Sequence, residues 1–349
     1  MLTEQQVKET LNQLQDPFLH RTFEETNAVQ EIKIKEEKKH VSVKIALSKT
    51  GTGEQLQLQT TIVNALKQAG AESVGLRFTD LSPEELAKFK TESSGESAPL
   101  LSPVNQTTFI AVASGKGGVG KSTVSVNLAI SLARLGKKVG IIDADIYGFS
   151  VPDMMGITKR PVVRGEKIVP VERKGVKVIS MGFFVEDNSP VIWRGPMLGK
   201  MLNNFFNEVE WGDLDYLVLD LPPGTGDVAL DVHTMLPHCK EIIVTTPHPT
   251  AAFVAARAGA MALRTEHEIL GVIENMSYFE SKVTGEKEYV FGKGGGEKLA
   301  DELQTSLLGK IPLGQPDWND DDFAPSVYEE DHPTGKIYNE IAQRVIDSI

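Results

Sequence analysis

The sequence predicts a doubly wound, mostly parallel α/β sheet preceded by a small α+β domain, and two observations support this fold class. Six short apolar runs alternate with stretches of helical periodicity in the second part of the chain. Parallel strands that are buried on both faces have this near-continuous apolar pattern. A stretch rich in Ser, Gly and Pro, residues 91–106, indicates a linker. We therefore expect a small domain at residues 1–90 and a larger domain at residues 107–349.

The elements expected in the small domain follow from capping patterns and periodicity. Thr3 and Gln6 form a capping-box pattern ahead of a helix whose apolar residues recur at helical spacing. Alternating apolar residues predict a strand at residues 41–47 with a hairpin partner around residues 32–34. The remaining predictions are a helix at residues 55–68, a strand at residues 74–78 and a last helix that begins at Ser82.

The larger domain is expected to alternate strands and helices. The six predicted strands are residues 109–113, 139–142, 176–179, 216–219, 242–245 and 269–273. A further strand ends at Ile311, an acidic surface segment lies around residues 320–322, and a final helix near residues 336–349 is expected to pack on the sheet. Ligands of such sheets bind at the carboxyl ends of the strands, so residues that directly follow the strands are the candidates for a site.

Composition limits the possible classes of function. The chain has 36 basic and 48 acidic residues and a formal charge of -12, so the whole molecule repels nucleic acids and anionic membranes at long range. No run approaches the roughly 18 apolar residues of a membrane span, and the first residues lack the features of a signal peptide. The single cysteine, Cys239, excludes an intramolecular disulfide. We expect a cytoplasmic protein with no membrane partner.

A glycine-rich loop lies between the first strand of the larger domain and a helical run, which is the context that a phosphate-binding loop requires. Its glycines allow successive backbone N–H groups to turn toward one centre, and the helix N-terminus adds partial positive charge. We expect Lys121 to bridge the β- and γ-phosphates of ATP, Ser122 to bind Mg²⁺ and Thr123 to reach the α-phosphate. The nucleotide-binding residues are predicted to be Gly115, Lys116, Gly117, Gly118, Val119, Gly120, Lys121, Ser122 and Thr123.

The second lysine of this loop, Lys116, makes it resemble the deviant Walker A loop of the MinD, ParA and nitrogenase iron protein class of ATPases. In that class the extra lysine crosses a dimer interface to the γ-phosphate bound by the partner, where it acts like an arginine finger. The resemblance therefore implies a homodimer that ATP closes face to face, with Lys116 and Lys121 as catalytic residues.

Carboxylates follow two of the predicted strands. Asp143 and Asp145 follow residues 139–142, and Asp220 ends the next strand of Walker B type. Carboxylates beside a triphosphate require Mg²⁺ or water between them, so Asp220 is expected to hold Mg²⁺ through a water molecule. By resemblance, Asp143 supports the metal-water shell and Asp145 orients or deprotonates the attacking water. The Pro-Pro-Gly-Thr-Gly segment at residues 222–226 is typical of a nucleotide-dependent switch loop.

Two further residues are candidates for binding adenine. Asn275 matches the position in this class at which an amide pairs with the base edge, and Pro312 follows a strand where its ring can pack on the base. Capping of a strand end is the alternative interpretation of both residues.

Longer sequence strings resemble the Mrp (ApbC-like) family over about residues 105–349. They are DADIYG at 143, WRGPM at 193, DYLVLDLPPGTGD at 215, GVIENMSYF at 271 and FGKGGGEKLA at 291. The small domain also resembles the short front domain of many members. Members of this family are ATP-hydrolysing iron–sulfur cluster carriers, which hold a cluster between two subunits through a Cys-x-x-Cys just after the ENMSYF string. In this sequence no cysteine follows Phe279, so the family's cluster ligands are missing.

Two functions remain open at this point. The first is the family role of an ATPase that passes iron–sulfur clusters to apo-protein clients. The alternative is an ATP-dependent DNA-binding regulator like the cysteine-less, SalA-like members of the family. For that role a patch of lysines in the small domain is the candidate surface, namely Lys33, Lys35, Lys38 and Lys39.

Several other residues are given a structural interpretation or a weak functional one. Cys239 is expected to be a small, partly buried hydrophobe, and the spacing of His233, His238 and His248 matches no common metal site. Tyr328, in an acidic segment expected to be exposed, is a hypothetical phosphate acceptor. Residues 193–197 are interpreted either as a contact with the dimer partner or switch, or as a plain turn between a strand and a helix.

Overall fold

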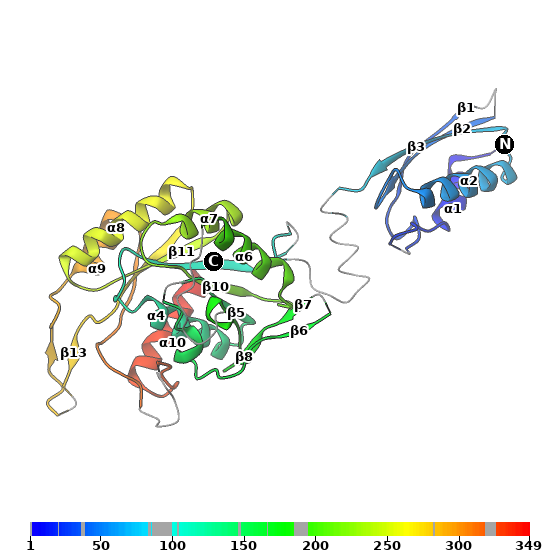
Figure 1. The fold of residues 1–349 in the computed structure, drawn as a ribbon. Coiled ribbons are helices and arrows are strands. Elements are labelled where there is room, and N and C mark those ends of the chain that lie inside the picture. Colours follow the sequence, from blue (N-terminus) through cyan, green and yellow to red (C-terminus); the bar gives the residue numbers. More distant parts are fainter. Residues whose placement is uncertain are drawn as a thin grey trace. The chain divides into compact units, whose positions relative to one another are not determined.

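The chain divides into two compact units, residues 1–105 and 106–349, which are described separately (Figure 1). The computed structural model describes residues 2–19, 21–35, 39–82, 85, 100–102, 105–145, 148–165, 167–184, 195–281, 283–317 and 326–349. Much of the predicted linker, the predicted helix after Ser82, the acidic residues 320–322 and the Trp193-Arg194 pair lie outside these residues.

The first unit is a three-stranded sheet with two helices. Its elements are α1 (Glu4–Asn12), β1 (Val29–Lys35), β2 (His40–Leu47), α2 (Gly53–Gln68) and β3 (Ser73–Asp80). The strand order is β1-β2-β3, with β1 antiparallel and β3 parallel to β2. The core holds Val7 and Leu11 from α1, Ile45 from β2 and Ile62 from α2. These elements confirm the predicted hairpin, helix and strand, and Thr3 and Gln6 form the predicted capping box.

A buried carboxylate joins two distant segments of this unit. Asp16 is 1% exposed and lies in the loop after α1. Its Oδ1 accepts hydrogen bonds from the backbone N–H groups of Phe18 (2.9 Å) and Leu19 (3.0 Å) and from the Ser48 hydroxyl (2.6 Å). Its Oδ2 accepts from the Ser48 backbone N–H at 2.8 Å. The carboxylate thus fastens the loop after α1 to the end of β2.

The second unit contains an eight-stranded sheet in the order β15-β12-β11-β4-β10-β5-β9-β8. The strands are β4 (Thr108–Ser114), β5 (Val139–Asp143), β8 (Val171–Arg173), β9 (Val176–Ser180), β10 (Tyr216–Asp220), β11 (Lys240–Thr245), β12 (Ile269–Glu274) and β15 (Leu307–Lys310). All neighbouring strands are parallel except the edge strand β8, which runs antiparallel to β9. The predicted doubly wound, mostly parallel sheet is confirmed.

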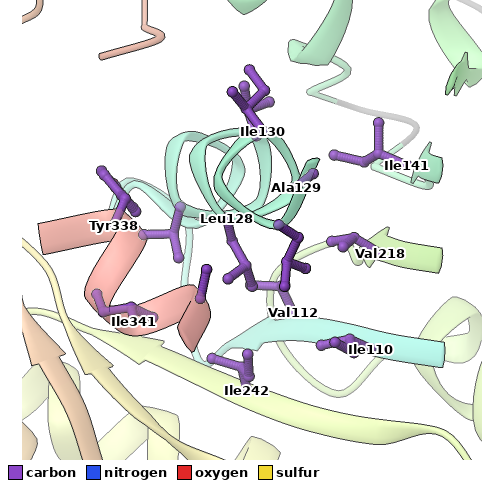
Figure 2. Packing of buried hydrophobic residues seen from close by; sticks show 14 of the residues in the cluster. Ile110, Val112, Leu128, Ala129, Ile130, Ile141, Val218, Ile242, Tyr338 and Ile341 are labelled. Atoms are coloured by element: carbon purple, nitrogen blue, oxygen red, sulfur yellow. The ribbon is translucent and has the colours of Figure 1, made fainter. Parts of the chain in front are cut away.

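Helices cover both faces of this sheet (Figure 1). They are α4 (Lys121–Arg134), α5 (Val151–Met154), α6 (Gly195–Glu208), α7 (Asp227–Met235), α8 (Pro249–Arg264), α9 (Gly295–Glu302) and α10 (Pro333–Asp347), with a short 3₁₀ helix at Met181–Phe184. On one face α4 packs against the central strands and α10, and Leu128 lies between Val112 and Tyr338 in this core (Figure 2). The final helix therefore packs on the large unit, as predicted.

Two small hairpins were not predicted from the sequence. One pairs β6 (Val162–Arg164) with β7 (Lys167–Val169), and the other pairs β13 (Phe279–Glu280) with β14 (Lys287–Glu288). Strands of two or three residues are too short to produce a recognisable periodicity. The β13–β14 hairpin follows the end of β12 and extends from the unit (Figure 1). None of the helices in the described part of the chain is both long enough and apolar enough to span a bilayer.

We expect Asp16→Asn to destabilise the first unit by about 2 to 3 kcal/mol, because an amide keeps one acceptor oxygen and turns an NH₂ group toward backbone donors. Calorimetry of the full chain would then show the melting transition of this unit lowered by roughly 10 °C or more. All three tryptophans lie beyond residue 105, so the fluorescence transition of the larger unit is an internal control. The exposed Asp80, which accepts one hydrogen bond from the Thr50 backbone, gives the matched variant Asp80→Asn. If both substitutions lowered the melting temperature of this unit equally, Asp16 would not be the residue that fastens the loop after α1 to the end of β2.

Candidate functional site

The glycine-rich loop connects the end of β4 to the start of α4, as predicted. Gly118 and Gly120 both have φ of +80°, a left-handed conformation that glycine adopts without strain. Gly115 has a different constraint, since a Cβ at this position would overlap the backbone of Val254 in α8. Residues 118 and 120 therefore require glycine for backbone conformation, and residue 115 requires it for close packing.

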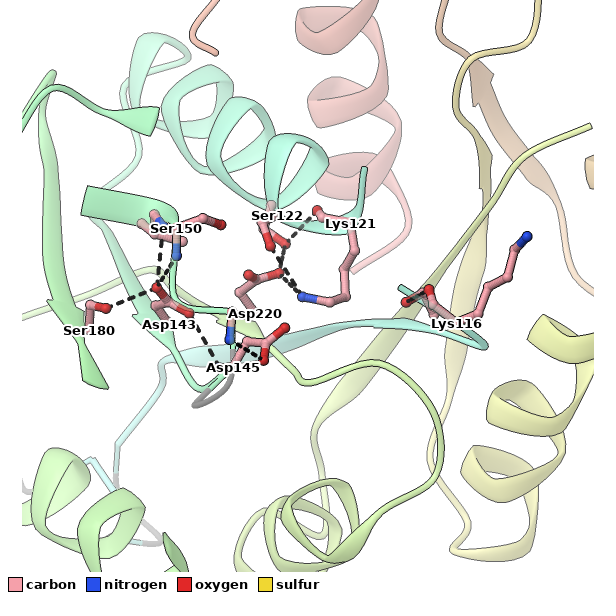
Figure 3. Close-up of polar contacts among 12 residues, drawn as sticks. Lys116, Lys121, Ser122, Asp143, Asp145, Ser150, Ser180 and Asp220 are labelled. Carbon is pink, nitrogen blue, oxygen red and sulfur yellow. Dashed lines mark hydrogen bonds and ion pairs between the residues drawn. The ribbon is translucent and has the colours of Figure 1, made fainter. Parts of the chain in front are cut away.

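The loop lysine at the start of α4 is buried against the Walker B aspartate (Figure 3). Lys121 is 6% exposed, and its Nζ lies 2.7 Å from Oδ1 of Asp220, which is fully buried. The Ser125 hydroxyl donates to the same oxygen at 2.7 Å, and Lys121 Nζ also lies 3.3 Å from the Ser122 hydroxyl. The other carboxylate oxygen, Oδ2, is buried and has no hydrogen-bond partner among the described residues. The Oδ2 atom of Asp220, together with the hydroxyl of Ser122, therefore fits a Mg²⁺ site.

A second carboxylate lies on the neighbouring strand, because β5 and β10 pair in parallel with Asp143 opposite Asp220. Asp143 is fully buried and accepts hydrogen bonds from the Ser180 hydroxyl (2.9 Å) and from the backbone N–H groups of Ser150 and Val151 (both 3.2 Å). Burial, and then the negative charge of Asp220, raise the pKa of the Asp143 carboxyl to about 7. An added positive charge would favour its ionised form.

Asp145 lies at the same edge of the sheet. Its backbone N–H donates to Oδ1 of Asp143 at 3.3 Å, and its own Oδ1 accepts from the Gly148 backbone at 3.2 Å. Parallel pairing of β5 and β10 thus aligns Asp143 with Asp220, and the start of α4 brings Lys121 and Ser122 to the same edge of the sheet, as the sequence predicted (Figure 3).

The other loop lysine is in a different environment. Lys116 is exposed, and its side chain extends away from Lys121 and the carboxylates (Figure 3). Within the described part of the chain it has no ion-pair partner, whereas its carbonyl oxygen accepts a hydrogen bond from the Ser114 hydroxyl at 3.1 Å. The Lys116 ammonium is therefore not directed at the carboxylate cluster of its own subunit.

The predicted switch loop lies beside the phosphate loop. After β10, the Leu221 backbone N–H donates to the carbonyl of Val112 at 3.2 Å, and the Gly224 N–H donates to that of Ser114 at 2.8 Å. Gly224 has φ of +89°, and α7 begins at Asp227 directly after this loop. The segment thus links the strand that carries Asp220 to the end of β4, directly before the phosphate loop.

The two candidates for adenine binding lie at the ends of the adjacent strands β12 and β15. The Asn275 side chain is 5% exposed, and its Nδ2 donates to the backbone carbonyl of Val119 in the phosphate loop at 2.9 Å. Pro312 directly follows Ile311. The Ile311 backbone N–H donates to the Glu274 carbonyl at 2.9 Å, and its carbonyl accepts from the Ser277 N–H at 2.8 Å. The adenine role of both residues stays a prediction.

Cys239 is buried, whereas the three histidines singled out in the sequence differ in their environment. Cys239 is 1% exposed, and burial raises the pKa of its thiol far above the usual value. His238 is exposed, and His248 caps the N-terminus of α8 by accepting from the Thr250 backbone. His233 is buried in a cluster that sequence reasoning missed.

This cluster joins α7 to β11 and to the segment before β12. His233 Nε2 contacts the buried Glu241 carboxylate, and the Thr265 hydroxyl lies within 3.0 Å of Nδ1 of both His233 and His267. The two imidazole rings stack with centroids 4.4 Å apart and an interplanar angle of 25°. The Nδ1 atoms of both rings thus converge on the Thr265 hydroxyl. His233, Glu241 and His267 each place one possible ligand atom within 4.8 Å of the other two, which makes the cluster a candidate metal site.

The expectation that Tyr328 is exposed is wrong. Tyr328 is 4% exposed, and burial raises the pKa of its phenol to about 12. Its backbone N–H donates to Asn127 of α4 at 3.0 Å, and its ring packs near Tyr338. The acidic composition of residues 329–331 misled the prediction, because the tyrosine itself faces the core.

The proposed lysine patch of the small unit is partly occupied by ion pairs. Lys33 contacts Glu31 at 2.5 Å and Lys39 contacts Glu72 at 2.8 Å, while Lys38 lies outside the described residues. These pairs reduce the positive charge that the patch could present to a polyanion.

A strand, a phosphate-binding loop and a helix in this order, with Asp220 on the adjacent strand, define the larger unit as a P-loop NTPase. A family profile described as "ParA: NUBPL iron-transfer P-loop NTPase" matches residues 105–346, and a profile described as "Iron-sulfur cluster assembly protein" matches residues 4–75. The chain therefore belongs to the iron-transfer family of P-loop NTPases, which confirms the Mrp-like resemblance.

Known relatives agree with this assignment. The chain is 70% identical over 345 residues to a Bacillus subtilis (strain 168) protein named "Iron-sulfur cluster carrier protein", and the match covers 99% of this chain and 98% of the relative. A Mycobacterium leprae protein of the same name is 42% identical, with 88% of this chain and 82% of the relative covered. Among solved structures, a nucleotide-binding protein from Archaeoglobus fulgidus in complex with ADP is 39% identical, with a TM-score of 0.55 and coverage of 66% of this chain and 90% of that one. MinD from Aquifex aeolicus shares the fold at 24% identity and a TM-score of 0.50, with 69% and 98% covered.

We expect the Cys239 thiol to be unreactive in the folded protein, because the thiolate is the reactive form and burial disfavours it. Ellman's reagent at pH 8 should release less than about 0.1 equivalent of chromophore from the native chain and about one equivalent in guanidinium chloride. Rapid reaction of one equivalent under native conditions would show that this thiol is accessible.

Proposed function

We propose that this chain is an ATP-hydrolysing switch that closes into a homodimer when ATP is bound. The observation that carries this proposal is the contrast between two lysines of one phosphate loop. Lys121 is buried against Asp220, whereas Lys116 is exposed and extends away from that cluster. A cation that is not used in its own site can serve a phosphate bound by a second subunit. The ADP complex of the Archaeoglobus fulgidus relative supports nucleotide binding by this chain.

In this proposal, the backbone N–H groups of residues 115–123 surround the phosphates of ATP. The terminal phosphates replace Asp220 as the partner of the Lys121 ammonium, and this frees the Asp220 carboxylate. Ser122 and Asp220 would hold Mg²⁺, with Asp143 supporting its water shell, and the ion would neutralise charge on the β- and γ-phosphates. Asp145 orients the attacking water.

The switch loop at residues 221–226 would transmit the state of the nucleotide. Two of its backbone N–H groups donate to carbonyls at the end of β4, directly before the phosphate loop, so a shift that begins there would move the start of α7. Within the closed dimer, Lys116 of each subunit stabilises the negative charge that develops on the γ-phosphate of the other.

The names of the relatives refer to an iron–sulfur cluster, and the thiol chemistry of this chain does not fit the binding of one. Clusters are normally held by four cysteine thiolates. This chain has one cysteine, which is buried and has a raised thiol pKa. We therefore propose that ATP-dependent dimerisation is retained while this chain does not ligate a cluster with its own thiolates. The alternative of a DNA-binding regulator is supported by none of the relatives compared above, and its lysine patch is partly neutralised.

Alanine substitution of each loop lysine tests the switch. Lys121→Ala should weaken ATP binding by at least about tenfold, because its charge acts in the same subunit. Lys116→Ala should retain ATP binding but lose ATP-dependent dimerisation and lower kcat by about 10² to 10³, as the loss of a cation supplied in trans does. Isothermal titration calorimetry, sedimentation velocity and phosphate release measure these properties.

The matched control is Lys138→Ala, an exposed lysine directly before β5, at the sheet edge opposite the carboxylates. It should leave ATP binding, dimerisation and turnover unchanged. If Lys116→Ala dimerises and turns over like the unaltered chain, the proposed role in trans is wrong.

Anaerobic reconstitution with iron and sulfide tests the statement about the cluster. We expect a colourless protein with less than about 0.2 iron per dimer after desalting, because four thiolates are not available. Cys239→Ser should behave identically. A stable brown protein whose visible absorption disappears in the Cys239→Ser variant would show that this cysteine ligates a cluster.

A further inference from the structure

Asn275, which the sequence predicted to bind adenine, contacts the phosphate loop through its side chain. The amide nitrogen of Asn275 donates to the Val119 carbonyl at 2.9 Å, and the side chain is 5% exposed. A Cβ at residue 120 would overlap this same nitrogen, so the amide occupies the space that is left free by the absent side chain of Gly120. The amide nitrogen therefore faces the loop backbone.

The geometry of the peptide bond gives this contact a consequence. The Val119 carbonyl and the Gly120 N–H belong to one planar trans peptide unit, in which C=O and N–H point in opposite directions. A hydrogen bond that holds the carbonyl toward Asn275 therefore directs the Gly120 N–H away from Asn275. That N–H has no acceptor among the described residues, and it is one of the donors expected to bind phosphate.

Asn275 is itself held firmly enough to act as a support. Its backbone N–H donates to the Thr245 carbonyl at 2.8 Å. The preceding Glu274 is buried, with Oε2 accepting from the Gly296 backbone at 2.6 Å and Oε1 accepting from the Ser277 hydroxyl at 2.5 Å. The following Met276 has φ of +54°, which is uncommon for a residue with a side chain. These hydrogen bonds fix the backbone at the end of β12, next to the phosphate loop.

We propose that Asn275 is a positioning residue for phosphate binding, which orients the peptide between Val119 and Gly120 so that the Gly120 N–H is directed at the phosphates. This inference rests on the proposed nucleotide site and assigns the Nδ2 donor of the amide to the loop backbone, which leaves Oδ1 for a contact with the base. Its contribution applies to any ligand with the triphosphate group, regardless of the base.

The test compares three probes: MgATP, MgGTP and inorganic tripolyphosphate, which has the phosphates but neither sugar nor base. In the full-length protein, Asn275→Ala and the uncharged, similarly sized Asn275→Leu both remove the amide donor without adding charge. Both should weaken the binding of all three probes, tripolyphosphate included, by about fivefold or more. Competition with a fluorescent ATP analogue measures the affinities, and thermal unfolding confirms that each variant is folded.

The outcomes separate this inference from the proposed function and from base recognition. A loss confined to ATP, with tripolyphosphate affinity unchanged, would show that Asn275 reads adenine and overturn the inference alone. Unchanged affinity for all three probes would also overturn it. If the unaltered chain binds none of the probes, the proposed nucleotide site fails as well. Should Asn275→Ala not fold, Asn275→Leu decides, and Asn207→Ala, which removes an exposed amide on α6, serves as the matched control.

Discussion

The ion pair between Lys121 and Asp220 is the constraint on which the site depends. Two opposite charges almost completely removed from solvent are stable only while each has a partner. The pair joins the first residue of α4 to the last residue of β10, and so it keeps the phosphate loop next to the Walker B strand in the absence of nucleotide. A phosphate group that draws Lys121 away leaves the carboxylate of Asp220 without its cation. That charge then requires another positive partner, which explains in physical terms why nucleotide and metal would bind together.

Much of this site could be predicted because it depends on short-range rules. A glycine-rich loop between a strand and a helix can be recognised as a phosphate-binding loop from the sequence alone. Parallel pairing of β5 and β10 then brings Asp143 and Asp220 to one edge of the sheet. The parts that could not be predicted depend on contacts between distant residues. Asn275 meets Val119 across 156 positions of the chain, and no spacing in the sequence signals that contact. His233, Glu241 and His267 come from three different elements, and only the fold brings them together.

Burial explains the remaining differences between expectation and structure. Tyr328 lies in an acidic segment, but its neighbours Glu329 and Asp331 are exposed while its own ring faces α4 and α10. Local composition describes the average surface of a segment and does not reveal which single side chain turns inward. Cys239 shows the opposite case, since an apolar context around a lone cysteine correctly indicated a buried position.

The packing of the last helix against α4 has a consequence for how the larger unit assembles. Asn127, in the middle of α4, is bonded to the backbone of Ser326 and Tyr328, and Arg134 at its end is bonded to the Tyr328 carbonyl. During synthesis on the ribosome, one side of α4 therefore stays uncovered until the residues of α10 have emerged. The helix that begins with Lys121 is therefore completed only by residues that follow much later in the chain.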